Sequence, residues 1–508
     1  MPADDQGQVL PRLVTGINGF DEISSGGLPA ASSTLVTGTV GSGKTVFALQ
    51  FLAEGIRQQG EPGVFVTFGE PADKMRRFVI EFGWDVPGWE SDGRWTFVDA
   101  TPGVEESPLI VGEHYDLSVL LLRVANAVQR TGAKRVAIDS IGVLLARFGD
   151  LEAVRDVILR TTAELDRLGV TTVITVSRDD ESEPMRVGIE EVVADNLIVL
   201  RNTSVEESRR RTVEVIKLRG THHRQGRFPF VITRERGMVV IPLTVRLDQP
   251  AMSQRIPSGI DGFDAMTGGG LLQSSVTLVS GSTGTGKTTF TLQFALTGAA
   301  AGEPVVVVGF EESRDQILRG MVGWGYDIPA LEASGMLRFV IDYPEVRTFE
   351  EHLVRIQDAA DDIGARRVVL DSMTSLRRSG PSRSFNEFAI GLTASLKDRE
   401  ITGMITPGQA SLVGSEVRAT EEHVSALSDA IVLLRYVEVY GEIRRVVAVL
   451  KQRGSDHDKA IRAYTIADDG VHVGAALRTT TGLMSGRTSQ LDAMESERVY
   501  DMFPERDD

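Results

Sequence analysis

The sequence contains two copies of one glycine-rich loop, and this repeat constrains the fold more than any other feature. The first copy is GTVGSGKT at Gly38–Thr45, and the second is GSTGTGKT at Gly281–Thr288. Both match G-x-x-x-x-G-K-[ST], in which backbone N–H groups surround a phosphate and the lysine neutralises its charge. The two lysines lie 287 − 44 = 243 residues apart, about the length of one large α/β domain. The chain is therefore predicted to be a tandem duplication of a nucleotide-binding unit.

The composition favours a globular protein and argues against several classes of partner. At 508 residues the chain is long enough for two domains with full cores, and it shows no apolar run of about 18 residues and no signal peptide. The absence of cysteine excludes disulfides and Cys-ligated zinc, and it suits a cytoplasmic protein. A net charge of −17 argues against a broad nucleic-acid-binding surface, because such surfaces gather Lys and Arg. We therefore expect no nucleic acid and no membrane among the partners.

Both halves repeat the same order of landmarks. An apolar strand leads into each glycine-rich loop, a helix follows, and further apolar strands then alternate with helices. Strands that are apolar on both faces are typical of parallel sheets covered by helices on both sides. We therefore predict an α/β fold with two P-loop NTPase domains, residues 1–245 and 246–476, each built on a mainly parallel twisted sheet. Three prolines mark a linker at Pro242–Pro257, and residues 477–508 are predicted to be a flexible polar tail, which need not have a partner.

In each half an apolar strand ends on an aspartate, Asp139 or Asp371. A carboxylate at the end of a strand beside a P-loop can hold the water shell of Mg²⁺, while the loop threonine is a direct ligand. We therefore predict one Mg²⁺ site at Asp139 with Thr45 and another at Asp371 with Thr288. The alternative is that each aspartate only caps the following turn.

Phosphoryl transfer also needs a group that orients or deprotonates the attacking oxygen, and here the two halves differ. After the strand that follows the P-loop helix, the second half has Phe310-Glu311-Glu312-Ser313, whereas the first half has Phe68-Gly69-Glu70-Pro71. In the second half one acid can face the γ-phosphate while the other acid holds the first in position. In the first half a single acid remains. The sites are therefore predicted to be chemically unequal, with Glu311, Glu312 and Glu70 as the catalytic candidates.

A Lys-x-Arg-Gly motif follows late in each half, KLRG at Lys217–Gly220 and KQRG at Lys451–Gly454. We expect the lysine and the arginine of each motif to lie two apart on one strand and so to point the same way. A histidine follows each motif, His223 or His457. Such a cluster suits a group that reaches the γ-phosphate held by a neighbouring molecule. The alternative is a strand face that makes ordinary surface salt bridges.

With these motifs the chain resembles the KaiC family, double-domain RecA-like ATPases and autokinases of the circadian clock. FGWD at Phe82–Asp85, WGYD at Trp324–Asp327 and HDKAIR at His457–Arg462 add to the likeness, which covers nearly the whole chain. The resemblance implies a homo-oligomer, a two-tiered hexamer, with ATP between subunits and Mg²⁺ as the metal. It also implies that the first tier hydrolyses ATP slowly, whereas the second phosphorylates its own Ser or Thr residues across the subunit boundary.

Carried over by position, the resemblance implies a role for each matching residue. Glu311 would be the general base of the C-terminal kinase and a metal ligand, with Glu312 as its partner. The nucleotide-binding residues of the first domain would be Gly41, Ser42, Gly43, Lys44 and Thr45, with Lys217, Leu218, Arg219, Thr221 and His223 from the adjacent subunit. Those of the second domain would be Thr283, Gly284, Thr285, Gly286, Lys287, Thr288, Trp324 and Arg445, with Lys451, Gln452, Arg453, Ser455 and His457 from the adjacent subunit.

The chain departs from the family at two places. The phosphoacceptor segment of the family aligns with Thr420–Ala426, where KaiC has adjacent Ser and Thr acceptors. Here Ser425 is followed by Ala426, so Ser425 is predicted as the leading acceptor and Thr420 as a relay or minor acceptor, against the alternative that Ser425 is an ordinary surface serine. The other departure is Gly69, where the family usually has its first-tier catalytic glutamate. Either Glu70 takes over, or the first site binds ATP mainly to hold the ring together.

Two other functions are compatible with the sequence. A RecA- or RadA-like DNA-dependent ATPase has the same core, although RadA-like proteins usually carry a Cys₄ zinc motif and the net charge is unfavourable. A signalling scaffold that ATP assembles, with little catalysis, would suit Gly69 but not the paired acids Glu311 and Glu312. For a KaiC-like ring, KaiB-like or other signalling proteins are candidate partners.

Overall fold

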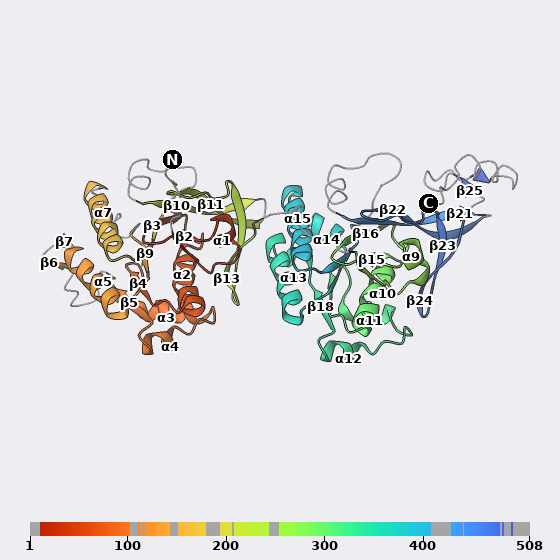
Figure 1. Ribbon diagram of the computed structural model, residues 1–508, viewed down its shortest axis with the longest axis horizontal. Coiled ribbons are helices and arrows are strands. Elements are labelled where there is room, and N and C mark those ends of the chain that lie inside the picture. The colour runs from red at the N-terminus through yellow and green to blue at the C-terminus, as the bar shows by residue number, and fades with distance from the viewer. Residues whose placement is uncertain are drawn as a thin grey trace, which may run out of the picture. The chain divides into compact units, whose positions relative to one another are not determined.

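The computed structural model of the chain divides into two compact units, Met1–Pro242 and Leu243–Asp508 (Figure 1). Most of the predicted linker at Pro242–Pro257 and most of the predicted tail at 477–508 lie outside the described residues. The structure describes residues 11–101, 110–111, 114–115, 117–142, 151–178, 194–205, 208–242, 253–407, 428–439, 441–477, 480–481 and 489–490.

Within the described part of the first unit, nine strands form one sheet in the order β13-β12-β11-β10-β3-β9-β8-β4-β5. The six strands from β10 to β5 run parallel, and β10 to β13 continue as antiparallel neighbours. The strands are β3 (Ser33–Gly38), β4 (Gly63–Thr67), β5 (Trp95–Asp99), β8 (Arg135–Asp139), β9 (Thr171–Ser177), β10 (Asn196–Val205), β11 (Ser208–Leu218), β12 (Arg227–Thr233) and β13 (Gly237–Val240). Two short pairs lie outside this sheet: β1 (Arg12–Leu13) with β2 (Leu28–Pro29), and β6 (Ile110–Val111) with β7 (His114–Tyr115).

Helices cover both faces of this sheet. One apolar cluster joins the helix after the P-loop to one face, and it contains Phe47, Leu49 and Phe51 of that helix. A second cluster lies on the other face and includes Val124 and Leu165 from two later helices. The helices are α1 (Phe20–Ile23), α2 (Lys44–Gln59), α3 (Ala72–Ile80), α4 (Val86–Ser91), α5 (Leu117–Thr131) and α7 (Leu151–Arg167).

The second unit repeats this architecture. Its nine described sheet strands follow the equivalent order β18-β17-β19-β20-β16-β21-β22-β23-β24. The predicted α/β fold with two tandem, mainly parallel sheets is therefore confirmed. The strands are β16 (Val276–Gly281), β17 (Val305–Gly309), β18 (Leu337–Ile341), β19 (Arg367–Asp371), β20 (Thr402–Ile405), β21 (Ala430–Val439), β22 (Glu442–Gln452), β23 (Arg462–Ala467) and β24 (Gly470–Ala476), with the short pairs β14 (Arg255–Ile256) and β15 (Leu271–Leu272), and β25 (Thr480–Thr481) and β26 (Ser489–Gln490). The helices are α9 (Asp261–Met266), α10 (Lys287–Ala300), α11 (Arg314–Gly320), α12 (Ile328–Ala333), the 3₁₀ turn η1 (Pro344–Val346), α13 (Phe349–Ile363), α14 (Met373–Arg378) and α15 (Ser382–Asp398).

A buried arginine ties each unit together beneath the P-loop helix. Arg135, whose side chain is 1% exposed, pairs with Glu61 at 2.8 Å and donates to the backbone carbonyls of Phe51 and Val14. Gly55 of α2 makes room for it, because a Cβ there would lie 2.3 Å from Nε of Arg135. Since a buried charge is tolerated only when it is paired and hydrogen-bonded, these contacts fix α2 against the sheet. The second unit repeats the set with Arg367, Glu303, Phe294, Pro257 and Gly298.

Among the described residues, no helix combines the length and the apolarity that crossing a membrane requires.

Candidate nucleotide-binding sites

The first glycine-rich loop joins the end of β3 to the start of α2. Gly41 and Gly43 have φ values of 76° and 95°, a left-handed conformation that favours glycine, and α2 begins at Lys44. The loop also lies tightly against the sheet, because a Cβ on Gly38 would approach the carbonyl oxygen of Leu200 to 2.2 Å. Backbone N–H groups at the start of a helix favour an anion, so this loop can hold a phosphate. The second loop makes the same connection between β16 and α10, which begins at Lys287.

In both units the loop lysine lies across its own loop. Nζ of Lys44 donates to the carbonyls of Gly38 and Thr39 at 2.7 and 2.8 Å. Lys287 does the same to the carbonyls of the corresponding residues, Gly281 and Ser282, at 3.0 and 3.1 Å. Burial lowers the pKa of both lysines, and the nearby strand-end aspartates oppose that shift. Each ammonium group is therefore held within reach of a phosphate that enters the loop.

The predicted metal residues of the first unit lie together. Oγ1 of Thr45 donates to Oδ2 of Asp139 at 2.8 Å, and the other oxygen of Asp139 accepts from Thr175 on the neighbouring strand β9. Burial raises the pKa of Asp139, and the hydrogen bonds from Thr175 and Thr45 and the charge of Lys44 oppose that shift. A hydroxyl and a carboxylate at the mouth of a phosphate loop are the donors that Mg²⁺ uses together with phosphate and water. These residues therefore fit the metal.

The second unit repeats this contact. Thr288 donates to Asp371, whose other oxygen accepts from Thr406, just after β20. Thr175 and Thr406 were not predicted from the sequence, because each lies on or just after a strand far along the chain from the P-loop. The described residues contain no cluster of three or more His, Asp or Glu that could hold a metal by itself. A cation at either site would therefore complete its shell with phosphate and water oxygens.

The catalytic candidates of the second unit lie beside this pair. Glu311 follows β17, and its Oε1 accepts hydrogen bonds from the hydroxyls of Ser372 and Ser375 at 2.8 and 2.6 Å. Burial raises the pKa of Glu312, and the charges of Asp371 and Glu311 raise it further. No role for the serine that follows Asp371 was predicted from the sequence. The structure shows that Ser372 orients Glu311.

The first unit is different at the equivalent place. Glu70 is half-exposed and pairs with Lys74, one turn along α3, at 2.7 Å. Its backbone carbonyl accepts from Oγ1 of Thr67 at 2.6 Å. Gly69, which precedes it, has no side chain to place beside Asp139. The single acid of the first site is therefore engaged with a surface lysine, whereas Glu311 is held by two hydroxyls.

The predicted strand positions of the two Lys-x-Arg-Gly motifs are partly wrong. The strand β11 ends at Leu218, so Lys217 lies on it and Arg219 lies in the following turn. The pairing stops because the N–H of Arg219 donates to the side-chain oxygen of Asn196, at the start of β10, at 3.2 Å. In the second unit β22 ends at Gln452, so Arg453 also lies in a turn.

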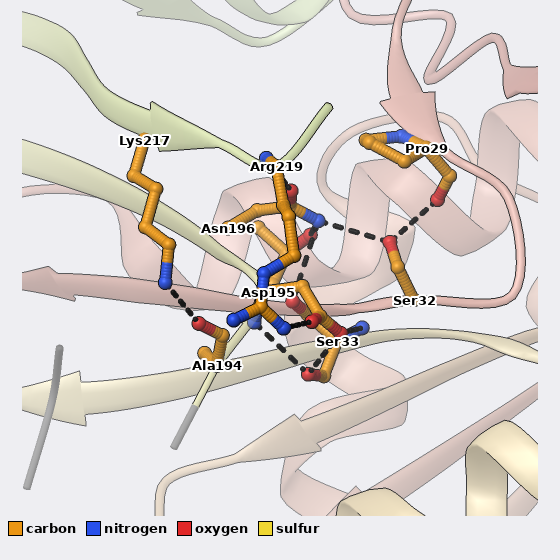
Figure 2. Close-up of polar contacts among 9 residues, drawn as sticks. Pro29, Ser32, Ser33, Ala194, Asp195, Asn196, Lys217 and Arg219 are labelled. Carbon is orange, nitrogen blue, oxygen red and sulfur yellow. Dashed lines mark hydrogen bonds and ion pairs between the residues drawn. The ribbon is translucent and has the colours of Figure 1, made fainter. Parts of the chain in front are cut away.

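Figure 2 shows that Lys217 and Arg219 nevertheless converge on the segment before β10. Lys217 donates to the carbonyl of Ala194 at 3.0 Å, and Arg219 pairs with Asp195 at 2.9 Å. This segment lies at the start of β3, because Asn196 pairs with Thr34, whereas the P-loop follows the end of that strand. The five residue steps of β3 span roughly 16 Å. These cations therefore lie at one end of the parallel strands, and the P-loop of their own unit lies at the other end.

The second unit has the same arrangement. Lys451 donates to the carbonyl of Ser428 at 2.8 Å, and the N–H of Arg453 donates to the carbonyl of Asp429 at 2.8 Å. Since Thr277 on β16 pairs with Ala430, these groups also lie at the start of the P-loop strand.

The remaining predicted residues of these motifs lie in or beside the same turns. Leu218 is buried, and Thr221 donates to its carbonyl at 3.3 Å. The ring nitrogen Nδ1 of His223 lies 3.2 Å from the carbonyl of Arg224. In the second unit Gln452 donates to Oγ of Ser455 at 2.8 Å. The backbone N–H of His457 donates to Oδ1 of Asp456 at 2.9 Å.

Two other predicted residues belong to the second unit. The guanidinium of Arg445 on β22 lies 5.6 Å from the centre of the Tyr436 ring, and the hydroxyl of Tyr436 donates to the carbonyl of Gly284. Arg445 therefore lies one side chain away from the P-loop. Trp324 follows α11 and packs against the apolar core of the second unit. The predicted acceptors Thr420 and Ser425 lie at 408–427, outside the described residues.

Comparison with known proteins decides the family. The family model "ATPase: KaiC" matches residues 13–245 and 256–478, so that both units are covered. The chain belongs to the KaiC family. It is 44% identical over 505 residues to circadian clock protein KaiC3 of Synechocystis sp., covering 99% of each chain. It is 40% identical over 494 residues to circadian clock oscillator protein KaiC of Synechococcus elongatus, covering 97% of this chain and 94% of that protein. The resemblance inferred from the sequence is thereby confirmed, and each half matches a KaiC-family ATPase domain.

Proposed function

We propose that this KaiC-family ATPase is a Ser/Thr autokinase in its second unit and a slow ATP hydrolase in its first, and that ATP binds between adjacent copies in a two-tiered ring. The observation that carries the proposal is the difference between the two acid sites. Glu311 is positioned by Ser372 and Ser375 beside the Thr288–Asp371 pair. Glu70 instead pairs with Lys74 and follows Gly69.

The second site supports acid–base work on a hydroxyl. Glu311 accepts two hydroxyl hydrogen bonds on Oε1, and no described residue donates to its other oxygen, which can therefore accept the proton of an attacking serine. Lys287 and the loop N–H groups would hold the β- and γ-phosphates. Thr288 and Asp371 would hold Mg²⁺, which supplies charge neutralisation on the phosphates when it is bound. Glu312, whose pKa is raised, would hold Glu311 in position.

The placement of the cations supports sites shared between copies. Lys217 and Arg219 lie roughly 16 Å along β3 from the P-loop of their own unit, beyond the reach of their side chains. Lys451 and Arg453 have the same placement. Cations that recur in both units, yet cannot reach their own phosphate loop, are suited to the loop of a neighbouring copy. In a closed ring, for which we propose six copies, every P-loop lies beside the cations of an adjacent copy.

The acceptor is proposed from the sequence. Ser425 carries the hydroxyl that aligns with the family's acceptor segment, Ala426 removes the adjacent one, and Thr420 is a second candidate. Intact-mass analysis of the full chain after incubation with Mg²⁺ and ATP tests this directly. We expect an added phosphate that Ser425→Ala removes and Thr420→Ala largely retains. An unchanged mass spectrum of the parent protein would refute the autokinase.

Ring assembly is tested on the same sample. The particle should be larger by light scattering with Mg²⁺ and ATP than without, and ATP turnover per chain should fall on dilution below the assembly concentration. A monomer with undiminished turnover would contradict shared sites. Single-stranded DNA added to the same assay should leave turnover unchanged, because a DNA-dependent ATPase is not favoured by a KaiC-family chain with a net charge of −17. A scaffold with little catalysis would instead assemble with ATP but gain no phosphate.

A further inference from the structure

We infer that Tyr464 is a positioning residue of the second nucleotide site, where its hydroxyl holds one peptide of the P-loop with the N–H turned toward the phosphate. The inference rests on the proposed function, because it requires that this loop binds a nucleotide. Tyr464 lies on β23 and is 4% exposed. Its hydroxyl donates to the backbone carbonyl of Thr285, the residue between Gly284 and Gly286 of the loop.

The geometry of the peptide group makes this contact effective. The carbonyl of Thr285 and the N–H of Gly286 belong to one planar trans peptide, so they point in opposite directions. Gly284 and Gly286 have φ values of 82° and 88°, which places this peptide within the curved part of the loop. A hydrogen bond that fixes the carbonyl from behind therefore fixes the N–H on the phosphate side. It also polarises the peptide, which makes the N–H a stronger donor.

The surroundings of Tyr464 keep its hydroxyl in this role. The ring belongs to the buried apolar cluster of the second unit. Burial raises the pKa of Tyr464, so the phenol remains protonated and able to donate. A buried hydroxyl without a partner would be destabilising, so the carbonyl of Thr285 and the phenol satisfy each other. Tyr436 donates to the carbonyl of Gly284 in the same way, so two successive loop carbonyls are held by tyrosines.

The first unit lacks this donor. Phe230 on β12 pairs with Val240, as Tyr464 on β23 pairs with Val473. The Phe230 ring also lies beneath the first loop, 3.6 Å from the position of a Cβ added to Gly43. Phenylalanine fills the same space without a hydroxyl. The hydrogen bond from Tyr464 to Thr285 beneath the phosphate cradle therefore has no counterpart from Phe230 in the first unit.

Removal of that hydrogen bond should weaken phosphate binding and leave the fold intact. Because a neutral hydrogen bond contributes modestly, Tyr464→Phe should raise the dissociation constant for ATP at the second site by about 3- to 10-fold. The loss should appear for ATP and ADP, which place phosphates in the loop, and not for adenosine. A merely structural role would weaken all three ligands together.

The experiment uses the full chain with Lys44→Met, so that binding of mant-ATP with Mg²⁺ reports the second site. In this background Tyr464→Phe is compared with Tyr343→Phe, a matched control at a tyrosine that is 75% exposed. Competition with ATP, ADP and adenosine separates phosphate binding from base binding. The reciprocal variant, Phe230→Tyr with Lys287→Met, should tighten mant-ATP binding at the first site by a similar factor. Thermal unfolding without nucleotide checks that each variant folds.

Each outcome of this experiment supports or overturns the role inferred for Tyr464. A 3- to 10-fold loss for ATP and ADP but not adenosine supports the inference. Equal affinity in Tyr464→Phe, or an equal loss for all three ligands, overturns it and leaves the proposed function standing. If the Lys44→Met parent binds no mant-ATP at all, the proposed function fails and the inference with it. Should Tyr464→Phe fail to fold, Phe230→Tyr decides: tighter binding supports the role of the hydroxyl, and unchanged binding overturns it.

Discussion

Replacing Asp166 by asparagine should stabilise the first unit at neutral pH and not in acid. Asp166, near the end of α7, lies 171 − 166 = 5 residues before β9, as Lys397 lies 402 − 397 = 5 residues before β20. Lys397 pairs with Asp429 at 3.0 Å. Asp166 instead faces the carboxylate of Asp195, and its buried Oδ1 has no hydrogen-bond partner among the described residues. The first unit thus has two like charges where the second has an ion pair.

The size and sign of the effect follow from the pKa of Asp166. Burial and then the charge of Asp195 raise that pKa from 3.8 to about 6. The raised pKa means that the folded protein favours protonated Asp166. The contribution of this residue to folding stability is therefore fully present below about pH 4 and is lost as the pH rises through about 6. Two pKa units correspond to roughly 3 kcal/mol, and solvent screening of this partly exposed group reduces that to about 1 kcal/mol. Asp166→Asn should therefore raise the melting temperature by about 2–4 °C at pH 7.5.

Tryptophan fluorescence provides the assay, because Trp84, Trp89 and Trp95 are buried in the first unit. Melting of Asp166→Asn and the parent would be compared at pH 4.5, 6 and 7.5. The gain should grow across this range and stay constant above it. Glu164→Gln, on the exposed side of the same helix, is the matched control and should change little at any pH. A gain of equal size at pH 4.5 and 7.5, or no gain at all, would refute the like-charge argument.

Three further predictions follow from the sites and the cores. Glu311→Gln should lower autophosphorylation by about 10²–10⁴-fold, whereas Glu70→Gln should lower it far less, as measured by ³²P incorporation; equal losses would contradict unequal sites. Mixing Lys451→Ala chains with Glu311→Gln chains should restore part of the activity that each lacks alone, because some interfaces then contain both intact groups; no recovery would argue against shared sites. Gly55→Ala should cost about 1–3 kcal/mol in urea unfolding because its Cβ would clash with the buried Arg135, and a small effect would show that the arginine can move aside.

The sequence was sufficient to predict the elements that depend on local patterns. The loop at Gly38–Thr45, the helix after it and the strand ending at Asp139 each carry a strong local signal, and all three have the predicted form. The duplicated α/β fold followed from the repetition of these signals. Thr45 after β3 and Asp139 at the end of β8 then come together across β9, because parallel strands have their carboxyl ends on the same side of the sheet.

What the sequence could not predict depends on contacts between distant segments. Thr175, Ser375 and Tyr464 are common residue types, and their roles appear only when the sheet places them beside Asp139, Glu311 and Thr285. The end of β11 before Arg219 was missed for a similar reason. There the side chain of Asn196 takes the N–H that a longer strand would have used, and no local pattern reveals such a competitor.

The buried arginines also decide where the chain can be truncated. Arg135 donates to the carbonyl of Val14, and Arg367 to that of Pro257. Nη2 of Arg367 already has no partner among the described residues, and Nη1 donates to both Pro257 and Phe294, so loss of Pro257 would remove one of the two carbonyls that hold this buried group. An expression fragment of the C-terminal half should therefore start upstream of Pro257, although β16 begins only at Val276.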